Sequence, residues 1–145
     1  MSLAYAYPSS RFEPAPVTDL ADKAARERLS KSALQGFFKL AQAWKLRDED
    51  ACILLGGLSS SALYEWKKKP ARLLEVDRIT RISYLLGIYK ALHILYGDSL
   101  ADEWVRLPNR NIIFGGRTPL GYMQQGGLLA MQTVRQLLDA RRGGM

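Results

Sequence analysis

Apolar side chains recur every three to four residues along most of the chain, which is the pattern of amphipathic helices. Between residues 30 and 45 they fall at positions 34, 37, 38, 41 and 44, so this segment has one apolar face. Ser30 precedes that face, and its residue type predicts that it caps the helix N-terminus. From Val76 to Tyr96 the same period predicts the longest helix, over residues 74–96 and roughly 35 Å long.

Shorter helices are predicted between and after these two, because glycine and proline mark their ends. Ser59 and Thr118-Pro119 are typical helix starts, and Gly56-Gly57 and Gly126-Gly127 are typical breaks. No run alternates with the period of two that a strand requires, so the sequence predicts an all-α fold. The shorter helices are expected over residues 48–55, 59–68, 99–107, 118–126 and 128–140.

Two further expectations concern packing. Trp44, Trp66 and Trp104 each fall at a helical packing position and are expected in the core, Trp66 against the first helices and Trp104 against the longest helix. Ile112-Ile113-Phe114 is predicted to be an apolar plug in the segment that joins two helices over residues 109–116. Residues 1–28 are poor in large aliphatic side chains and contain prolines, which indicates a flexible arm with a possible short helix near its end.

Residues 48–66 have the pattern of a helix-turn-helix. A short helix carries the small side chain of Cys52, a Gly56-Gly57 turn follows, and the second helix has Leu63 and Trp66 on its inner side. Two helices that cross steeply need a small residue at the contact and glycine at the bend. Gly57 makes the turn one residue longer than in the standard motif. The alternative interpretation is a helical corner inside a bundle, with a solvated lysine face.

The second helix of this motif would offer polar and basic side chains to DNA. Its N-terminal amides can bind a phosphate, and the lysines at positions 67 to 69 add sequence-independent attraction. Because one short helix reads few bases, we expect a dimer on a palindromic operator. The candidate DNA-binding residues are Ser59, Ser60, Ser61, Tyr64, Lys67 and Lys68.

The net charge and the low numbers of cysteine and histidine limit the functions that the protein can have. Lys+Arg number 21 against 14 Asp+Glu, a formal charge of +7 that suits an anionic partner. A single cysteine, Cys52, and a single histidine, His93, argue against a disulfide framework, a metal site and a Ser-His-Asp triad. We therefore expect no enzyme activity, no metal and no cofactor. Asp98, Asp102 and Glu103 are interpreted as a solvated helix start, Cys52 as a small buried residue and His93 as a structural or surface residue.

The last third of the chain carries the most specific pattern. A glycine-Thr118-Pro-Leu segment precedes a short helix with Met123, then the Gly126-Gly127 break and a final helix. Upstream, Trp104 is followed by a Pro108-Asn turn. This arrangement resembles the toxin-binding domain of the Xre/MbcA/ParS antitoxin family, and with the helix-turn-helix the resemblance covers about residues 30–145. Position 121 is glycine where many relatives are expected to have an acidic residue.

The resemblance implies a type II antitoxin that covers the active-site cleft of a RES-domain toxin and binds its own promoter as an autorepressor. Such toxins consume NAD or transfer ADP-ribose. The implied partners are that toxin, operator DNA and further copies of the chain, as a homodimer or a larger complex with toxin. The alternative is a stand-alone helix-turn-helix regulator whose C-terminal domain only dimerises. Either protein is expected in the bacterial cytoplasm, since no segment approaches the ~20 apolar residues of a membrane span.

The expected organisation follows. An arm over residues 1–28 precedes the Xre-like helix-turn-helix domain, residues 29–73, and a long connecting or dimerisation helix, residues 74–97. The toxin-binding domain, residues 98–145, ends in a basic tail.

Arginine concentrates in that last domain. Residues 106–145 contain six arginines, no lysine and one acidic residue, Asp139. Guanidinium groups pair with carboxylates bidentately, as protein interfaces prefer. A basic tail that enters a cleft is the functional interpretation, and a frayed chain end is the alternative. The candidate toxin-binding residues are Arg117, Arg135, Arg141, Arg142, Gly143 and Gly144.

Overall fold

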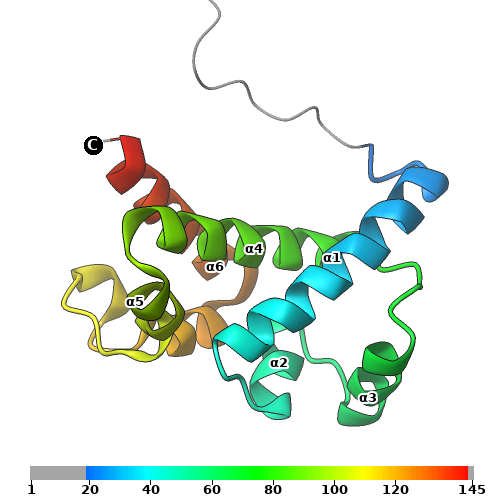
Figure 1. The fold of residues 1–145 in the computed structure, drawn as a ribbon, viewed down its shortest axis with the longest axis horizontal. Coiled ribbons are helices and arrows are strands. Elements are labelled where there is room, and N and C mark those ends of the chain that lie inside the picture. The colour runs from blue at the N-terminus through cyan, green and yellow to red at the C-terminus, as the bar shows by residue number, and fades with distance from the viewer. Residues whose placement is uncertain (1–18, 144–145) are drawn as a thin grey trace, which may run out of the picture.

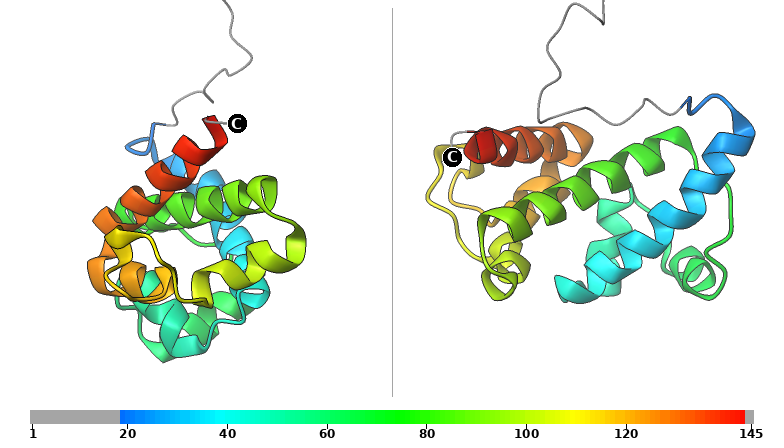
Figure 2. Two further views of the ribbon diagram at one scale, coloured as in Figure 1. Left: turned by 90° about the vertical axis from the view of Figure 1, so that its left-hand side faces the viewer. Right: turned by 45° about the horizontal axis from the view of Figure 1, so that its top comes forward.

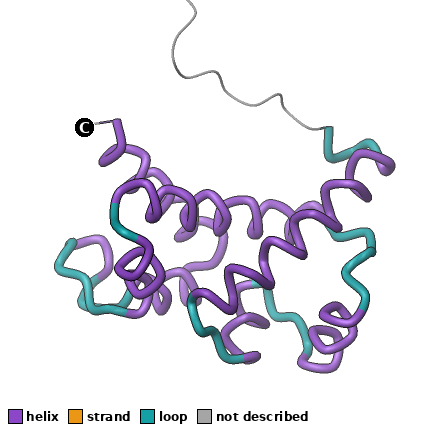
Figure 3. The backbone as a smooth tube through the Cα atoms, in the orientation of Figure 1, coloured by secondary structure: helices purple, strands orange, loops and turns teal. Residues whose placement is uncertain are grey.

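The computed structural model describes residues 19–143, and helices dominate this range. The all-α prediction is confirmed, since the described residues contain helices and loops but no strand (Figure 3). None of the helices in residues 19–143 combines the length and the hydropathy of a membrane span. The α-helices are α1 (Lys23–Ala43), α2 (Asp48–Leu54), α3 (Ser60–Lys68), α4 (Val76–Leu95), α5 (Asp98–Glu103) and α6 (Pro119–Gly143), and two 3-10 turns are η2 (Trp104–Arg106) and η3 (Ile112–Phe114).

Helix α4 is the centre of the fold. It runs along the molecule and packs against both α1 and α6 (Figures 1 and 2). Buried side chains spaced three to four residues apart, from Ile79 to Leu92, make this packing continuous. Helix α3 lies at one end of the long axis, whereas the loop over residues 106–117 and the C-terminal end of α6 lie at the other (Figure 1).

One hydrophobic core extends through the described residues. It includes Phe37 of α1, Leu54 of α2, Leu63 of α3, Ile82 of α4 and Met131 of α6, all at most 1% exposed. Helix α4 therefore contributes to the same core as the helices before and after it. The predicted domain boundaries at residues 73 and 97 stay predictions, and the core is continuous across both of them.

Two predicted helix starts, Ser59 and Thr118, coincide with capping contacts. The Ser59 hydroxyl accepts a hydrogen bond from the Ala62 amide at 3.2 Å, and the Thr118 hydroxyl accepts one from Gly121 at 3.0 Å. Both are N-cap geometries that satisfy an otherwise unpaired helix amide. The predicted Gly126-Gly127 break is confirmed, because Gly127 has φ 64° and ψ −142° inside α6.

The prediction that Ser30 caps the first helix is wrong. Helix α1 begins at Lys23, and the Asp22 carboxylate accepts from the Ala24 amide at 3.1 Å. Ser30 is fully buried inside α1, where its hydroxyl donates to the Arg26 carbonyl at 2.6 Å. The hydroxyl also accepts from the Leu74 amide at 3.0 Å, a partner 44 residues away that no local pattern reveals. Residues 23–28 of the predicted arm are thus helical, and residues 1–18 lie outside the described residues.

The prediction of burial is correct for two of the three tryptophan side chains, although the turn that carries Trp104 packs mainly against α6 and α5 rather than against the long helix as predicted. Trp44 is 0% exposed and Trp104 is 7% exposed, so both belong to the core. The prediction of a buried Trp66 is wrong, because the ring is half-buried at the edge of the core. The guanidinium groups of Arg72 and Arg78 lie 5.3 and 5.5 Å from its centroid. The short helix α3 buries Leu63, whereas Trp66, one turn later, is covered by the two arginine side chains.

Candidate functional site

The geometry of the segment predicted to be a helix-turn-helix depends on the two glycines between α2 and α3. Gly56 and Gly57 have φ of 94° and 88°, values that strain any residue with a Cβ. The Cys52 carbonyl accepts from the amides of Gly57 at 2.9 Å and Leu58 at 3.1 Å, which closes the turn. Burial, together with the charge of Asp48, raises the pKa of the Cys52 thiol. Cys52 is therefore a protonated packing residue at the helix contact.

The predicted DNA-binding side chains share one helix and its N-terminus, and all of them are exposed. These are Ser59, Ser60, Ser61, Tyr64, Lys67 and Lys68. The Lys68 ammonium lies 4.5 Å from the centroid of the Tyr64 ring. Lys67 is engaged within the molecule, because its Nζ lies 2.8 Å from Oδ1 of Asp48 in the first turn of α2. Both partners are exposed, so this ion pair can open when a phosphate competes.

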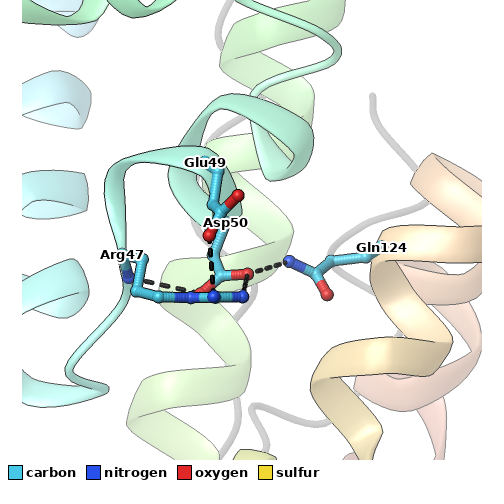
Figure 4. Close-up of polar contacts among 4 residues, drawn as sticks. All are labelled: Arg47, Glu49, Asp50 and Gln124. Carbon is cyan, nitrogen blue, oxygen red and sulfur yellow. Dashed lines mark hydrogen bonds and ion pairs between the residues drawn. The ribbon is translucent and has the colours of Figure 1, made fainter.

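A polar contact joins α2 to α6 (Figure 4). The Gln124 side-chain amide of α6 donates to Oδ1 of Asp50 at 2.9 Å, and the Arg47 amide donates to Oδ2 at 3.2 Å. Arg47 also forms an ion pair with Glu49 at 2.7 Å. Burial raises the pKa of Asp50, but the hydrogen bonds from Gln124 and Arg47 outweigh it and lower the pKa overall. The ionised carboxylate thus fixes the first helix of the motif on α6. Sequence reasoning missed this pair, whose members are 74 residues apart.

Arg81 of α4 lies between the two glycine breaks. Its Nε donates to Asp77 at 2.8 Å, so the guanidinium is held in place. That Nε is 3.1 Å from where a Cβ on Gly56 would lie, and Nη1 is 3.8 Å from the equivalent point on Gly127. The turn of the helix-turn-helix and the kink of α6 therefore pack against the same side chain.

The C-terminal arginines are part of a helix rather than of a free tail. The prediction of a tail from residue 141 is wrong for residues 141–143, because α6 continues to Gly143. The Arg141 guanidinium donates to the Tyr96 hydroxyl at 3.0 Å, a contact that supports this last turn. Asp139 pairs with Arg135 at 3.0 Å and with Arg142 at 3.9 Å. Gly144 lies outside the described residues.

The loop over residues 106–117, which we call the connector, is anchored by one aromatic side chain. Phe114 is fully buried and meets Trp104 and Tyr122 edge to face, with centroids 5.9 and 5.3 Å away. The predicted apolar plug is correct for Phe114 but wrong for Ile112, which is 92% exposed. Consecutive residues of a 3-10 turn point about 120° apart, so all three plug residues cannot face the core. The predicted toxin-binding Arg117 ends this loop and is exposed.

A second polar cluster joins α4 to α5. Nδ1 of His93 lies 2.9 Å from Asp98 and Nε2 lies 2.8 Å from Asp102. Burial lowers the pKa of His93, but the hydrogen bonds and charges of the two aspartates outweigh it and raise the pKa overall. The prediction of a merely solvated helix start is thus incomplete, since both carboxylates hold His93. The sequence feature that could have predicted this cluster is the separation of His93 from the two aspartates, five and nine residues across the Gly97 turn.

These sites define a small helical protein with two short helices joined by a diglycine turn at one end and an arginine-bearing helical half at the other. The family model of the antitoxin Xre/MbcA/ParS C-terminal toxin-binding domain matches residues 91–144. An uncharacterized protein of Sinorhizobium fredii, y4oB, is 41% identical over 112 residues, which cover 77% of this chain and 84% of that protein. Residues 91–144 therefore form an Xre/MbcA/ParS-type antitoxin toxin-binding domain, and the chain as a whole is similar to y4oB.

The family assigns a role to the second half of the molecule. The matched range begins in the last turns of α4 and contains α5, the connector and α6. The family model describes this range as an antitoxin toxin-binding domain, which implies a toxin partner. Arg117, Arg135, Arg141 and Arg142 all lie inside this range.

Proposed function

We propose that this antitoxin neutralises a RES-domain toxin by covering its active-site cleft, and that it binds its own promoter as an autorepressor. The observation that carries the first part is the basic, helical end of the matched domain. Arg141 and Arg142 stand on a rigid stem that packs on α4, and Gly143 adds no side chain that would obstruct a narrow opening. A RES-type toxin must admit NAD to a cleft, so a stem that occupies the cleft is sufficient to inhibit.

Truncation tests this part of the proposal. The toxin is produced by co-expression from the adjacent reading frame, and its NAD consumption is measured with increasing antitoxin. Deleting residues 140–145 is expected to leave toxin binding largely intact while NAD consumption returns. Tyr96→Phe is the matched control, because it removes the hydrogen bond to Arg141 but keeps the stem. Full inhibition by the truncated protein at saturating concentration would contradict the proposal.

The promoter-binding part is supported by the exposed face of α3. Lys67→Glu with Lys68→Glu is expected to weaken operator binding and to flatten its dependence on salt, because phosphate contacts release counterions. Lys90→Glu reverses the charge of an exposed residue on α4, and this control should have little effect on operator binding. Asp48→Asn releases Lys67 from its ion pair and is expected to strengthen binding. Equal operator affinity of the double variant and wild type across a salt series would contradict this part.

The separation of the two surfaces supports a protein that holds DNA and toxin together. Helix α3 and the C-terminal end of α6 lie at opposite ends of the long axis (Figures 1 and 2). A toxin on one end would leave α3 accessible to the promoter. A stand-alone regulator that uses residues 98–145 only to dimerise predicts instead that the co-expressed toxin does not bind. A pull-down with that toxin distinguishes the two functions.

A further inference from the structure

The connector exposes an unusual side chain within the toxin-binding domain. Ile112 is 92% exposed, and Leu107, five residues earlier, is 42% exposed. A single exposed aliphatic side chain is ordinary on a protein surface. Ile112 differs from such a residue in two respects: the structure of its loop and the charge of the neighbouring residues.

The connector holds Ile112 outward in a defined conformation. The Asn111 side chain accepts from the Ile113 amide at 3.1 Å, and the Phe114 amide donates to the Asn111 carbonyl at 3.1 Å. Gly115 follows in the left-handed region with φ 56°, and buried Phe114 anchors the turn. A loop backbone fixed in this way loses little conformational entropy on binding, which favours an interface anchor at Ile112.

Positive charge predominates on this surface. Arg110 and Arg117 are exposed and residues 104–138 contain no aspartate or glutamate, whereas Arg106 shares a surface pocket with Asp102 and Glu103. Among residues 19–143, Arg135 and Arg142 pair with Asp139, whereas no carboxylate lies within ion-pair distance of the three connector arginines. An exposed apolar side chain on a loop that also carries the unpaired guanidinium groups of Arg110 and Arg117 is complementary to an apolar pocket with a carboxylate rim.

We infer that the connector is a docking surface for the toxin, with Ile112 in an apolar pocket and Arg110 and Arg117 on carboxylates at its rim. The inference rests on the proposed function and adds to it a contact outside the C-terminal stem. The connector lies at the same end of the molecule as the end of α6 (Figures 1 and 2). One toxin can therefore bind the connector and receive the stem, so that affinity and inhibition have separate sources.

The experiment is a calorimetric titration of the full-length antitoxin with the toxin from the adjacent reading frame. Ile112→Asp is expected to weaken binding at least about tenfold, as a central interface anchor does. Ile112→Leu is expected to bind like wild type. Ile53→Asp is the matched control, because Ile53 is a 47% exposed isoleucine on α2, outside the matched domain. Thermal melts of all variants establish that each is folded.

The charged rim has its own measurement. Arg110→Glu with Arg117→Glu is expected to weaken toxin binding and to reduce its salt dependence. Toxin binding by folded Ile112→Asp within twofold of wild type would overturn the inference while leaving the proposed function intact. Failure of the wild-type chain to bind toxin would instead refute the proposed function, and the inference with it.

Two other occupants of the connector are excluded by parallel measurements. Sedimentation of wild type and Ile112→Asp without toxin shows whether the surface joins copies of the chain. Operator binding by the Arg110→Glu, Arg117→Glu variant shows whether it binds DNA. The inference expects neither property to change, and a lost dimer or weakened operator binding in place of the toxin effect would overturn it.

Discussion

At the scale of single residues, a buried hydroxyl joins two distant parts of the chain. Ser30 satisfies the Leu74 amide from inside α1. Ser30→Ala leaves that amide without a partner, and we expect it to lower the free energy of unfolding by about 1–3 kcal/mol. Ser32→Ala, an exposed site one half-turn away, should change it by less than about 0.5 kcal/mol. Urea unfolding of both variants measures the difference, and equal midpoints would show that the Leu74 hydrogen bond contributes nothing.

His93 makes stability depend on pH. Both ring nitrogens face carboxylates, so the bound form is the imidazolium, and its pKa in the folded protein is raised. Because the pKa of His93 is higher in the folded protein, its protonation stabilises the fold, and this stabilisation is complete below the pKa of the unfolded chain, near 6.5. The stabilisation is lost as the pH rises through the pKa of the folded protein. The melting temperature of wild type relative to His93→Gln is therefore expected to fall as pH increases from about 6.5. A constant difference across that range would contradict the assignment.

At the scale of helices, the end of α1 contains a correctable strain. Lys45 has φ 53°, and the amides of Lys45 and Leu46 donate back to Gln42 and Ala41 at 3.1 and 2.9 Å. This is the left-handed position that helix termini usually give to glycine. Lys45→Gly is expected to raise the free energy of unfolding by up to about 1 kcal/mol. Lys39→Gly, inside α1, should lower it by a similar amount. A loss of stability in both variants would exclude strain at Lys45.

The positions of several helix ends could be predicted because they depend on residues close to them in the sequence. Ser59, Thr118 and Gly127 each act within a few residues of their own position, so type and spacing were enough to predict the ends of α3 and α6. Ser30, Asp50 and His93 act through other elements. Their partners are up to 74 residues away, and periodicity carries no information about which polar side chains meet across a helix crossing.

At the scale of the whole molecule, one core and the Asp50–Gln124 contact predict cooperative unfolding. We expect a single calorimetric transition whose enthalpy equals the van't Hoff value. Gln124→Ala should lower the unfolding free energy by about 1 kcal/mol and move that one transition without splitting it. Gln125→Ala, an exposed neighbour, is the control. Two resolved transitions would show that the helix-turn-helix melts apart from the C-terminal half.

The position of Arg81 between Gly56 and Gly127 has a consequence for inheritance. Recombination that joined the N-terminal half of one relative to the C-terminal half of another would separate side chains that fit each other, Asp50 from Gln124 and Arg81 from either Gly56 or Gly127. The two halves are therefore expected to be inherited as a pair. A chimaera cut within α4 would lose contacts that hold the two halves together. Designers of orthogonal antitoxins would therefore have to change surface residues on an intact chain.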